Sequence, residues 1–266
     1  MMLDAAGAGS IAEDVDSVEI LGCRLARLRR DEVVDRVFAA LAEGAGGQLI
    51  TANVDHLRRF TREPEIRELF ARADLVVADG VPLLWAARLR GEPLPERVAG
   101  SDLVWDLAAR AAAEGRSLFL LGGNPGAAEA AAAVLRERWP ALRLAGLASP
   151  MLSAEPDADE LAALRSDLEG AQPDLVYVAL GAPKQERVIQ ALRASLPGAW
   201  WVGVGISLSF ISGEIQRAPV WVQRLGMEWL HRTLQEPGRL ARRYLLEDLP
   251  FFAHMLLDAL RQRRSA

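Results

Sequence analysis

The sequence predicts an α/β fold, namely a Rossmann-like, mostly parallel sheet with helices on both faces and a basic helical C-terminal appendage. Short apolar runs such as LVV at 75–77 alternate with longer segments whose apolar residues recur at helical spacing. Beyond residue 207 no further strand pattern follows. With 266 residues and 51% hydrophobic content, the chain is large enough to bury a full core.

The element order follows from these patterns and from the Gly, Pro, Asp and Ser residues between them. The predicted elements are a hairpin at 18–28, a helix at 31–43, a strand at 48–50, helices at 54–62 and 64–72, a strand at 75–77, a helix from 82, a loop at 91–100, a helix from 101 or 102 to 114, a strand at 117–121, a helix at 127–138, a strand at 142–148, a helix at 157–168, a strand at 174–180, a helix at 188–196, a strand at 200–204, and two to four helices from 219 onwards, broken near Pro237 and Pro250.

Charge and composition divide the chain into three parts. We expect a disordered leader over 1–17, a core over 18–215 and the appendage over 216–266. The appendage carries nine arginines against five acids, whereas the remainder has 22 basic and 31 acidic residues. The overall charge of −5 argues against nucleic acid, and the basic, leucine-rich appendage suits a membrane surface or a polyphosphate. The leader lacks a signal peptide's pattern, and the single cysteine fits a reducing compartment, so a cytoplasmic location is expected.

Polar residues follow four of the predicted strands. In open α/β sheets, ligands bind where the carboxyl ends of the strands converge. The candidate binding residues at these ends are Thr51, Asn53, Asp79, Gly80, Lys184, Gln185, Gly203 and Gly205. Taken alone, Asp79 is more often a helix N-cap than a catalytic acid. His56, on the following helix, is expected to be a surface or packing residue.

The catalytic and metal-binding motifs that the sequence lacks restrict the reactions that it could catalyse. No nucleophile elbow occurs, and neither acid pair, at 14–16 or 157–159, lies at a strand end, so no metal is expected to hold a diphosphate. Arginines would have to neutralise such a group, and Arg97 with the appendage arginines supplies planar, bidentate donors. One acid and several arginines suit transfer of a group from a nucleotide diphosphate, with Asp79 as the base.

Several longer stretches carry a family resemblance. TANVD, ADLVVADGVPLLWAARL, LPERVAGSDL, FLLGGNPGAAEAAA, PDLVYVALGAPKQER, VGVGISLSFISGEIQRAP and EWLHRTLQEPGRLARRYL together resemble the WecG/TagA/CpsF glycosyltransferases, glycosyltransferase family 26, from about residue 18 to about residue 249. The resemblance implies a bacterial, inverting enzyme that needs neither metal nor other cofactor. It also implies a core of the kind called GT-E.

The same resemblance implies the substrates. Such enzymes transfer a sugar, often N-acetylmannosamine, from a UDP-sugar to a polyprenyl-diphosphate-linked sugar during cell-surface polysaccharide synthesis. The appendage is implied to dock on the inner face of the cell membrane, and a homo-oligomer off the membrane is plausible. Catalytic roles fall on Asp79, Thr51 and Arg97. Substrate-binding roles fall on Asn53 and Gln185, and among the appendage arginines on Arg232, Arg239 and either Arg242 or Arg243.

One position departs from the family pattern, and two other functions stay open. Many members have an aspartate where this chain has Ser209, so sugar choice or a local cap is expected to differ.

A non-catalytic accessory subunit of a polysaccharide transferase would use the same surface to bind a partner. A nucleotide-sugar oxidoreductase or epimerase would need a dinucleotide fingerprint, and neither GGNPG at 122–126 nor the glycines at 203 and 205 provide one.

Overall fold

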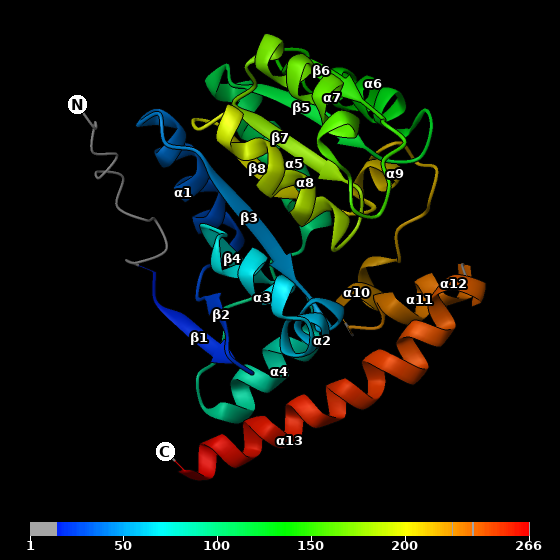
Figure 1. Cartoon of the computed structure of the whole chain (residues 1–266). Coiled ribbons are helices and arrows are strands. Elements are labelled where there is room, and N and C mark those ends of the chain that lie inside the picture. Colours follow the sequence, from blue (N-terminus) through cyan, green and yellow to red (C-terminus); the bar gives the residue numbers. More distant parts are fainter. Residues whose placement is uncertain (1–14, 225, 236, 266) are drawn as a thin grey trace.

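A six-stranded parallel sheet organises the protein (Figure 1). The computed structural model describes residues 15–224, 226–235 and 237–265. The strand order is β4-β3-β8-β7-β5-β6, and a separate two-stranded hairpin, β1-β2, precedes the sheet in the chain. The α/β class and the parallel sheet are as the sequence predicts, whereas most of the predicted leader lies outside the described residues.

The elements of the first half are β1 (Ser17–Ile20), β2 (Cys23–Ala26), α1 (Arg30–Ala42), β3 (Gly47–Ala52), α2 (Val54–Arg62), α3 (Pro64–Ala71), β4 (Leu75–Ala78), α4 (Val81–Arg90) and α5 (Gly100–Glu114). Those of the second half are β5 (Ser117–Gly122), α6 (Ala127–Arg138), β6 (Arg143–Ala148), α7 (Ala158–Ala171), β7 (Leu175–Ala179), α8 (Lys184–Leu192), the 3₁₀ turn η1 (Arg193–Ser195), β8 (Trp200–Gly203) and α9 (Ser207–Ile211). The appendage contains α10 (Val220–Arg224), α11 (Glu228–Gln235), α12 (Pro237–Arg242), the π-helix η2 (Arg243–Asp248) and α13 (Leu249–Ser265).

Helices cover both faces of the sheet because the central strands are apolar on both sides. In β7 every residue is buried. Tyr177 faces the cluster formed with α1, α5 and α6, while Val176 and Val178 face the cluster formed with α7 and α8. Continuous apolar runs of this kind are typical of parallel strands that are buried on both faces.

The appendage shares an apolar core with the N-terminal part of the chain. Helix α13 runs along α4 (Figure 1), and its residues Phe251, Met255 and Ala259 are buried with Val18 and Leu83. The appendage is therefore packed into the molecule by hydrophobic burial. Among the described helices, none has the length and apolar character needed to cross a membrane.

The structure corrects the predicted elements in three places. Helix α8 begins at Lys184, earlier than the predicted start at 188, so Lys184 and Gln185 lie in its first turn. The short helix α9, which follows β8, was not predicted. The described part of the appendage contains five helical segments, more than the predicted two to four. The predicted break at Pro237 is present, since α12 begins there, and the unpredicted π-helical turn η2 precedes α13.

Candidate active site

A cavity of about 1000 Å³ lies at the carboxyl ends of the sheet strands. Loops after β3, β4, β5, β6, β7 and β8 contribute to its lining, and α11, η2 and α13 of the appendage form the remaining wall. The predicted site residues that line this cavity are Thr51, Asn53, Asp79, Gly80, Arg97, Lys184, Gln185, Gly203, Gly205, Arg232 and Arg243. Arg242 is exposed and lies outside the lining, and the side chain of Arg239 is not among those described.

Asp79 follows β4 directly and is half-buried in the cavity wall. Its carboxylate oxygen Oδ2 accepts a hydrogen bond from the backbone N–H of Gly100, at 3.4 Å. Burial raises the pKa of Asp79 to about 6, although Arg97 opposes the shift. A carboxyl group with a pKa close to neutral can accept a proton during a reaction and release it afterwards. Because Asp79 contacts the first turn of α5 and is not the N-cap of α4, the capping interpretation fails.

Thr51 and Asn53 reach the cavity from β3 and the turn after it. A Cβ added at Gly100 would lie 3.0 Å from Thr51 Oγ1, so the hydroxyl lies against the turn that binds Asp79. Asn53 is the N-cap of α2, and its Oδ1 accepts the backbone N–H of His56 at 3.2 Å. In return, His56 Nδ1 accepts the backbone N–H of Asn53 at 3.3 Å. His56 is buried against Phe70, as expected of a packing residue, and it also lines the cavity.

Gln185 supports the glycine turn after β8. Its Oε1 accepts the Gly205 N–H at 3.1 Å, and its Nε2 donates to Glu186 Oε1 at 2.8 Å. A Cβ at Gly203 would lie 2.7 Å from Gln185 Nε2, so only glycine allows this approach. His56 Nε2 lies 3.8 Å from Glu186 Oε1. Gln185, Gly203 and Gly205 line the cavity and form part of its floor, whereas Glu186 is buried and lies outside the lining.

Lys184 binds the loop that follows β6 and holds it beside the cavity. Its Nζ donates to the backbone carbonyl of Leu152, at 3.0 Å, and both residues belong to the lining. Residues 150–152 follow β6 and form one rim of the cavity, where Met151 is almost fully exposed. The chain's one lysine thus holds this rim next to the first turn of α8.

Arg97 is part of a closed ring of four charged side chains, which we call the arginine ring: Arg97, Asp102, Arg217 and Glu228. Arg97 contacts Glu228 Oε2 at 3.1 Å and Asp102 Oδ2 at 3.5 Å. Arg217 contacts the other carboxylate oxygen of each acid. Burial alone would raise the pKa of Asp102, but Arg217 and Arg97 bring it below its ordinary value. Charges in the ring therefore alternate and balance.

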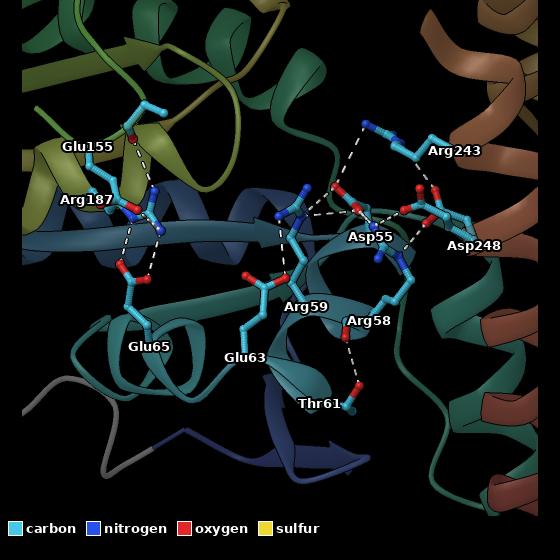
Figure 2. Close-up of polar contacts among 12 residues, drawn as sticks. Asp55, Arg58, Arg59, Thr61, Glu63, Glu65, Glu155, Arg187, Arg243 and Asp248 are labelled. Carbon is cyan, nitrogen blue, oxygen red and sulfur yellow. Dashed lines mark hydrogen bonds and ion pairs between the residues drawn. The ribbon is translucent and has the colours of Figure 1, made fainter.

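A second ionic cluster fastens η2 to α2, and we call it the clasp: Asp55, Arg58, Arg243, Glu247 and Asp248 (Figure 2). Arg58 is buried and contacts three acids: Asp55, Glu247 at 3.0 Å and Asp248 at 3.1 Å. Figure 2 shows Arg243 approaching the same acids from the appendage, at 3.4 Å from Asp248 and 3.9 Å from Asp55. Arg243 also lines the cavity and lies 4.7 Å from the ring of Tyr244.

Aromatic side chains line the appendage side of the cavity. Trp85 of α4 lies 5.9 Å from Phe252 of α13, and Trp229 of α11 lies 5.8 Å from Tyr244 of η2, measured between ring centroids. All four rings belong to the lining. The cavity therefore has a polar floor at the sheet and a partly aromatic wall in the appendage, a combination suited to an amphipathic ligand.

Ser209 occupies the position where an aspartate was expected. It is buried in α9, and its hydroxyl donates to Glu214 Oε2 at 2.8 Å. Glu214 Oε1 also accepts the side-chain amide of Asn124, at 2.7 Å. A carboxylate thus lies next to this position, but Glu214 supplies it. An aspartate at 209 would place two like charges together.

Sequence reasoning missed several residues that the appendage, α2 and α4 add to the site. Asp55, Trp85, Glu228, Trp229, Tyr244, Asp248 and Phe252 line the cavity but were not predicted. Their local patterns are those of ordinary amphipathic helices. Within the described residues, no group of three or more His, Cys, Asp or Glu side chains is placed to hold a metal ion.

Comparison with known families agrees with the geometry. The sequence model described as "Glycosyl transferase WecG/TagA/CpsF family" matches residues 18–265, which is nearly the whole chain. Membership implies glycosyltransferase activity in cell-surface polysaccharide synthesis, with a nucleotide-sugar donor and a lipid-linked acceptor in general terms. The matched region includes every residue that lines the cavity. The chain belongs to the WecG/TagA/CpsF family of glycosyl transferases.

Proposed function

We propose that the protein transfers a sugar resembling N-acetylmannosamine from a UDP-sugar to a polyprenyl-diphosphate-linked sugar, with inversion and without a metal ion. The observation that carries this proposal is the position of Asp79. This acid has a pKa of about 6 and shares one cavity with Arg97, Arg232 and Arg243. A base and several cations in one cavity suit the displacement of an anionic leaving group.

The proposed step is a single displacement. Asp79 removes the proton from an acceptor hydroxyl, and the resulting oxygen attacks the anomeric carbon of the donor. The bond between that carbon and the diphosphate breaks, and UDP leaves with the electron pair. Arg97 and the appendage arginines stabilise the negative charge that develops on the diphosphate. Attack from the face opposite the leaving group inverts the anomeric centre.

The aromatic wall and the appendage surface support a lipid-linked acceptor. Large apolar side chains are exposed along α10 to α13, namely Val220, Trp221, Leu234, Leu245, Leu246, Leu249, Leu257 and Leu260. Exposed apolar residues together with arginines are typical of helices that lie on an anionic membrane surface. Docking on the inner face of the cell membrane would bring the cavity to an acceptor whose polyprenyl chain remains in the bilayer.

A transfer assay tests this function. The purified protein is mixed with a short-chain polyprenyl-diphosphate-linked N-acetylglucosamine and a panel of UDP-sugars, with EDTA or with Mg²⁺, and the lipid is analysed by mass spectrometry. We expect one added hexosamine or hexose, at equal rates in EDTA and Mg²⁺. A product that forms only with Mg²⁺ would contradict the metal-free mechanism. If the protein binds UDP but forms no product, the proposed acceptor is contradicted. If it neither binds UDP nor forms a product, a non-catalytic accessory role is favoured.

A further inference from the structure

The arginine ring joins the appendage to Arg97, the residue proposed to bind the diphosphate. Arg97 precedes α5, and Asp102 lies in its first turn, whereas Arg217 and Glu228 come from the appendage. Glu228 is the first residue of α11, and it lines the cavity together with Arg97. We propose that Glu228 is a positioning residue, which fixes the guanidinium of Arg97 for the diphosphate of the donor. This role rests on the proposed function.

The geometry leaves Arg97 able to bind a phosphate while Glu228 holds it. A guanidinium has five N–H donors. Arg97 uses one donor at Nη1 for Glu228 and one at Nη2 for Asp102, which leaves three. Glu228 therefore restricts the orientation of Arg97 and does not occupy all of its donors. A planar guanidinium that is already oriented loses less freedom when it binds a phosphate.

Glu228 is itself held in place from two sides. Its second oxygen, Oε1, accepts Nε–H of Arg217 at 3.2 Å. Just before it, Gly226 has a φ of 72°, and a Cβ added there would lie 2.8 Å from Val81 Cβ in the first turn of α4. Only glycine permits this approach of the appendage backbone to the turn after Asp79. The start of α11 is thus fixed to the core at the point where Glu228 reaches Arg97.

Through this arrangement the appendage would act on the diphosphate without any of its own arginines having to contact it. When α11 is docked, Glu228 completes the ring and Arg97 is held from both sides. If Glu228 loses its charge, the only ion pair that Arg97 keeps within the ring is the longer contact to Asp102, an acid that Arg30 and Arg217 also engage. Glu228 therefore acts on the donor through Arg97.

A double-mutant cycle on UDP affinity tests this coupling in the full-length protein. The variants are Glu228→Gln, Arg97→Met and the double variant, with calorimetric titration of UDP and a melting curve for each. We expect Glu228→Gln to weaken UDP binding roughly tenfold. In the Arg97→Met background the same change should have no further effect, because the residue through which Glu228 acts is gone. Glu228→Asp should bind UDP with intermediate affinity.

Asp258→Asn is the matched control, since Asp258 is an acid on α13 outside the cavity lining. The UDP affinity of this variant should equal that of the unmodified protein. Equal losses from Glu228→Gln in both backgrounds would overturn the proposal, because an effect on general structure does not require Arg97. Unchanged or tighter UDP binding by Glu228→Gln would overturn it as well. Absence of UDP binding by the unmodified protein would overturn the proposed donor, and this role with it.

Discussion

The clasp and the arginine ring both join the appendage to the core beside one cavity, but they differ in burial. At the centre of the clasp, the side chains of Asp55, Arg58 and Asp248 are 7–8% exposed, whereas the ring side chains are 18–24% exposed. The outer clasp side chains, Glu247 and Arg243, are 39% and 30% exposed. Ion pairs that are almost completely buried are costly to break, whereas charged side chains that border a cavity remain accessible to a ligand. We therefore expect the buried centre of the clasp to serve attachment, whereas the ring and the cavity-facing Arg243 serve the substrate.

The largest effect on stability is expected from a substitution of Arg58, at the centre of the clasp. In Arg58→Met, Asp55 and Asp248 would lose the guanidinium that lies between them while both remain buried. Removing one partner of a buried pair typically costs about 3–5 kcal/mol. We expect faster proteolytic cleavage within the appendage and a lower free energy of unfolding in urea. If the variant resists protease as well as the unmodified protein, the clasp does not hold the appendage.

Substitution of Asp79, beside the ring, is expected to raise the stability of the protein, in contrast to Arg58→Met. Because burial raises the pKa of Asp79 from 3.8 to about 6, the folded state binds a proton more tightly than the unfolded state does. Stability should therefore fall as the pH rises from about 4 to about 6, and remain lower above that. Asp79→Asn removes this cost, so it should stabilise the protein at pH 8 by about 1–2 kcal/mol, after allowance for partial solvation.

Melting curves of both proteins at several pH values measure this effect. We expect the advantage of Asp79→Asn to shrink as the pH falls towards 4, where the carboxyl group is protonated in the folded state and partly protonated in the unfolded state. An equal advantage at pH 4 and pH 8 would show that the charge of Asp79 is not its cause.

A smaller effect is expected at the rim. Lys184→Met retains the aliphatic stem but loses the hydrogen bond to the Leu152 carbonyl. A typical intramolecular hydrogen bond contributes about 0.5–1.5 kcal/mol. Hydrogen exchange should rise at residues 150–155, while the appendage remains as protected as before. Unchanged exchange in this loop would mean that Lys184 does not hold it.

The smallest effect is expected from an ionic cluster that resembles the clasp in composition but lies at the surface. Arg187 contacts Glu65 and Glu155, which are more than half exposed (Figure 2). Exposed pairs contribute about 0–1 kcal/mol. Arg187→Met should thus leave the melting temperature nearly unchanged, and it is the matched control for Arg58→Met. A loss as large as that of Arg58→Met would show that burial does not explain the difference between the clusters.

Much of the fold could be predicted because its signals are local. Apolar runs marked the strands, and the residues after them, such as Asp79 and Asn53, reach the cavity because parallel strands end at a common edge. The contacts of the appendage are different in kind. Arg97 and Glu228 are 131 positions apart, and Arg58 and Asp248 are 190 apart. No periodicity connects such pairs, so they emerge only from the folded structure.

The most direct test of the account is the pH dependence of sugar transfer under single-turnover conditions, for the unmodified protein and for Asp79→Asn. A base must be deprotonated to act, so transfer by the unmodified protein should rise through a midpoint near pH 6 and then level off. Asp79→Asn should be roughly 10²- to 10⁴-fold slower at pH 8 while it still binds UDP. Transfer by Asp79→Asn at the unmodified rate would contradict the assignment of Asp79 as the catalytic base.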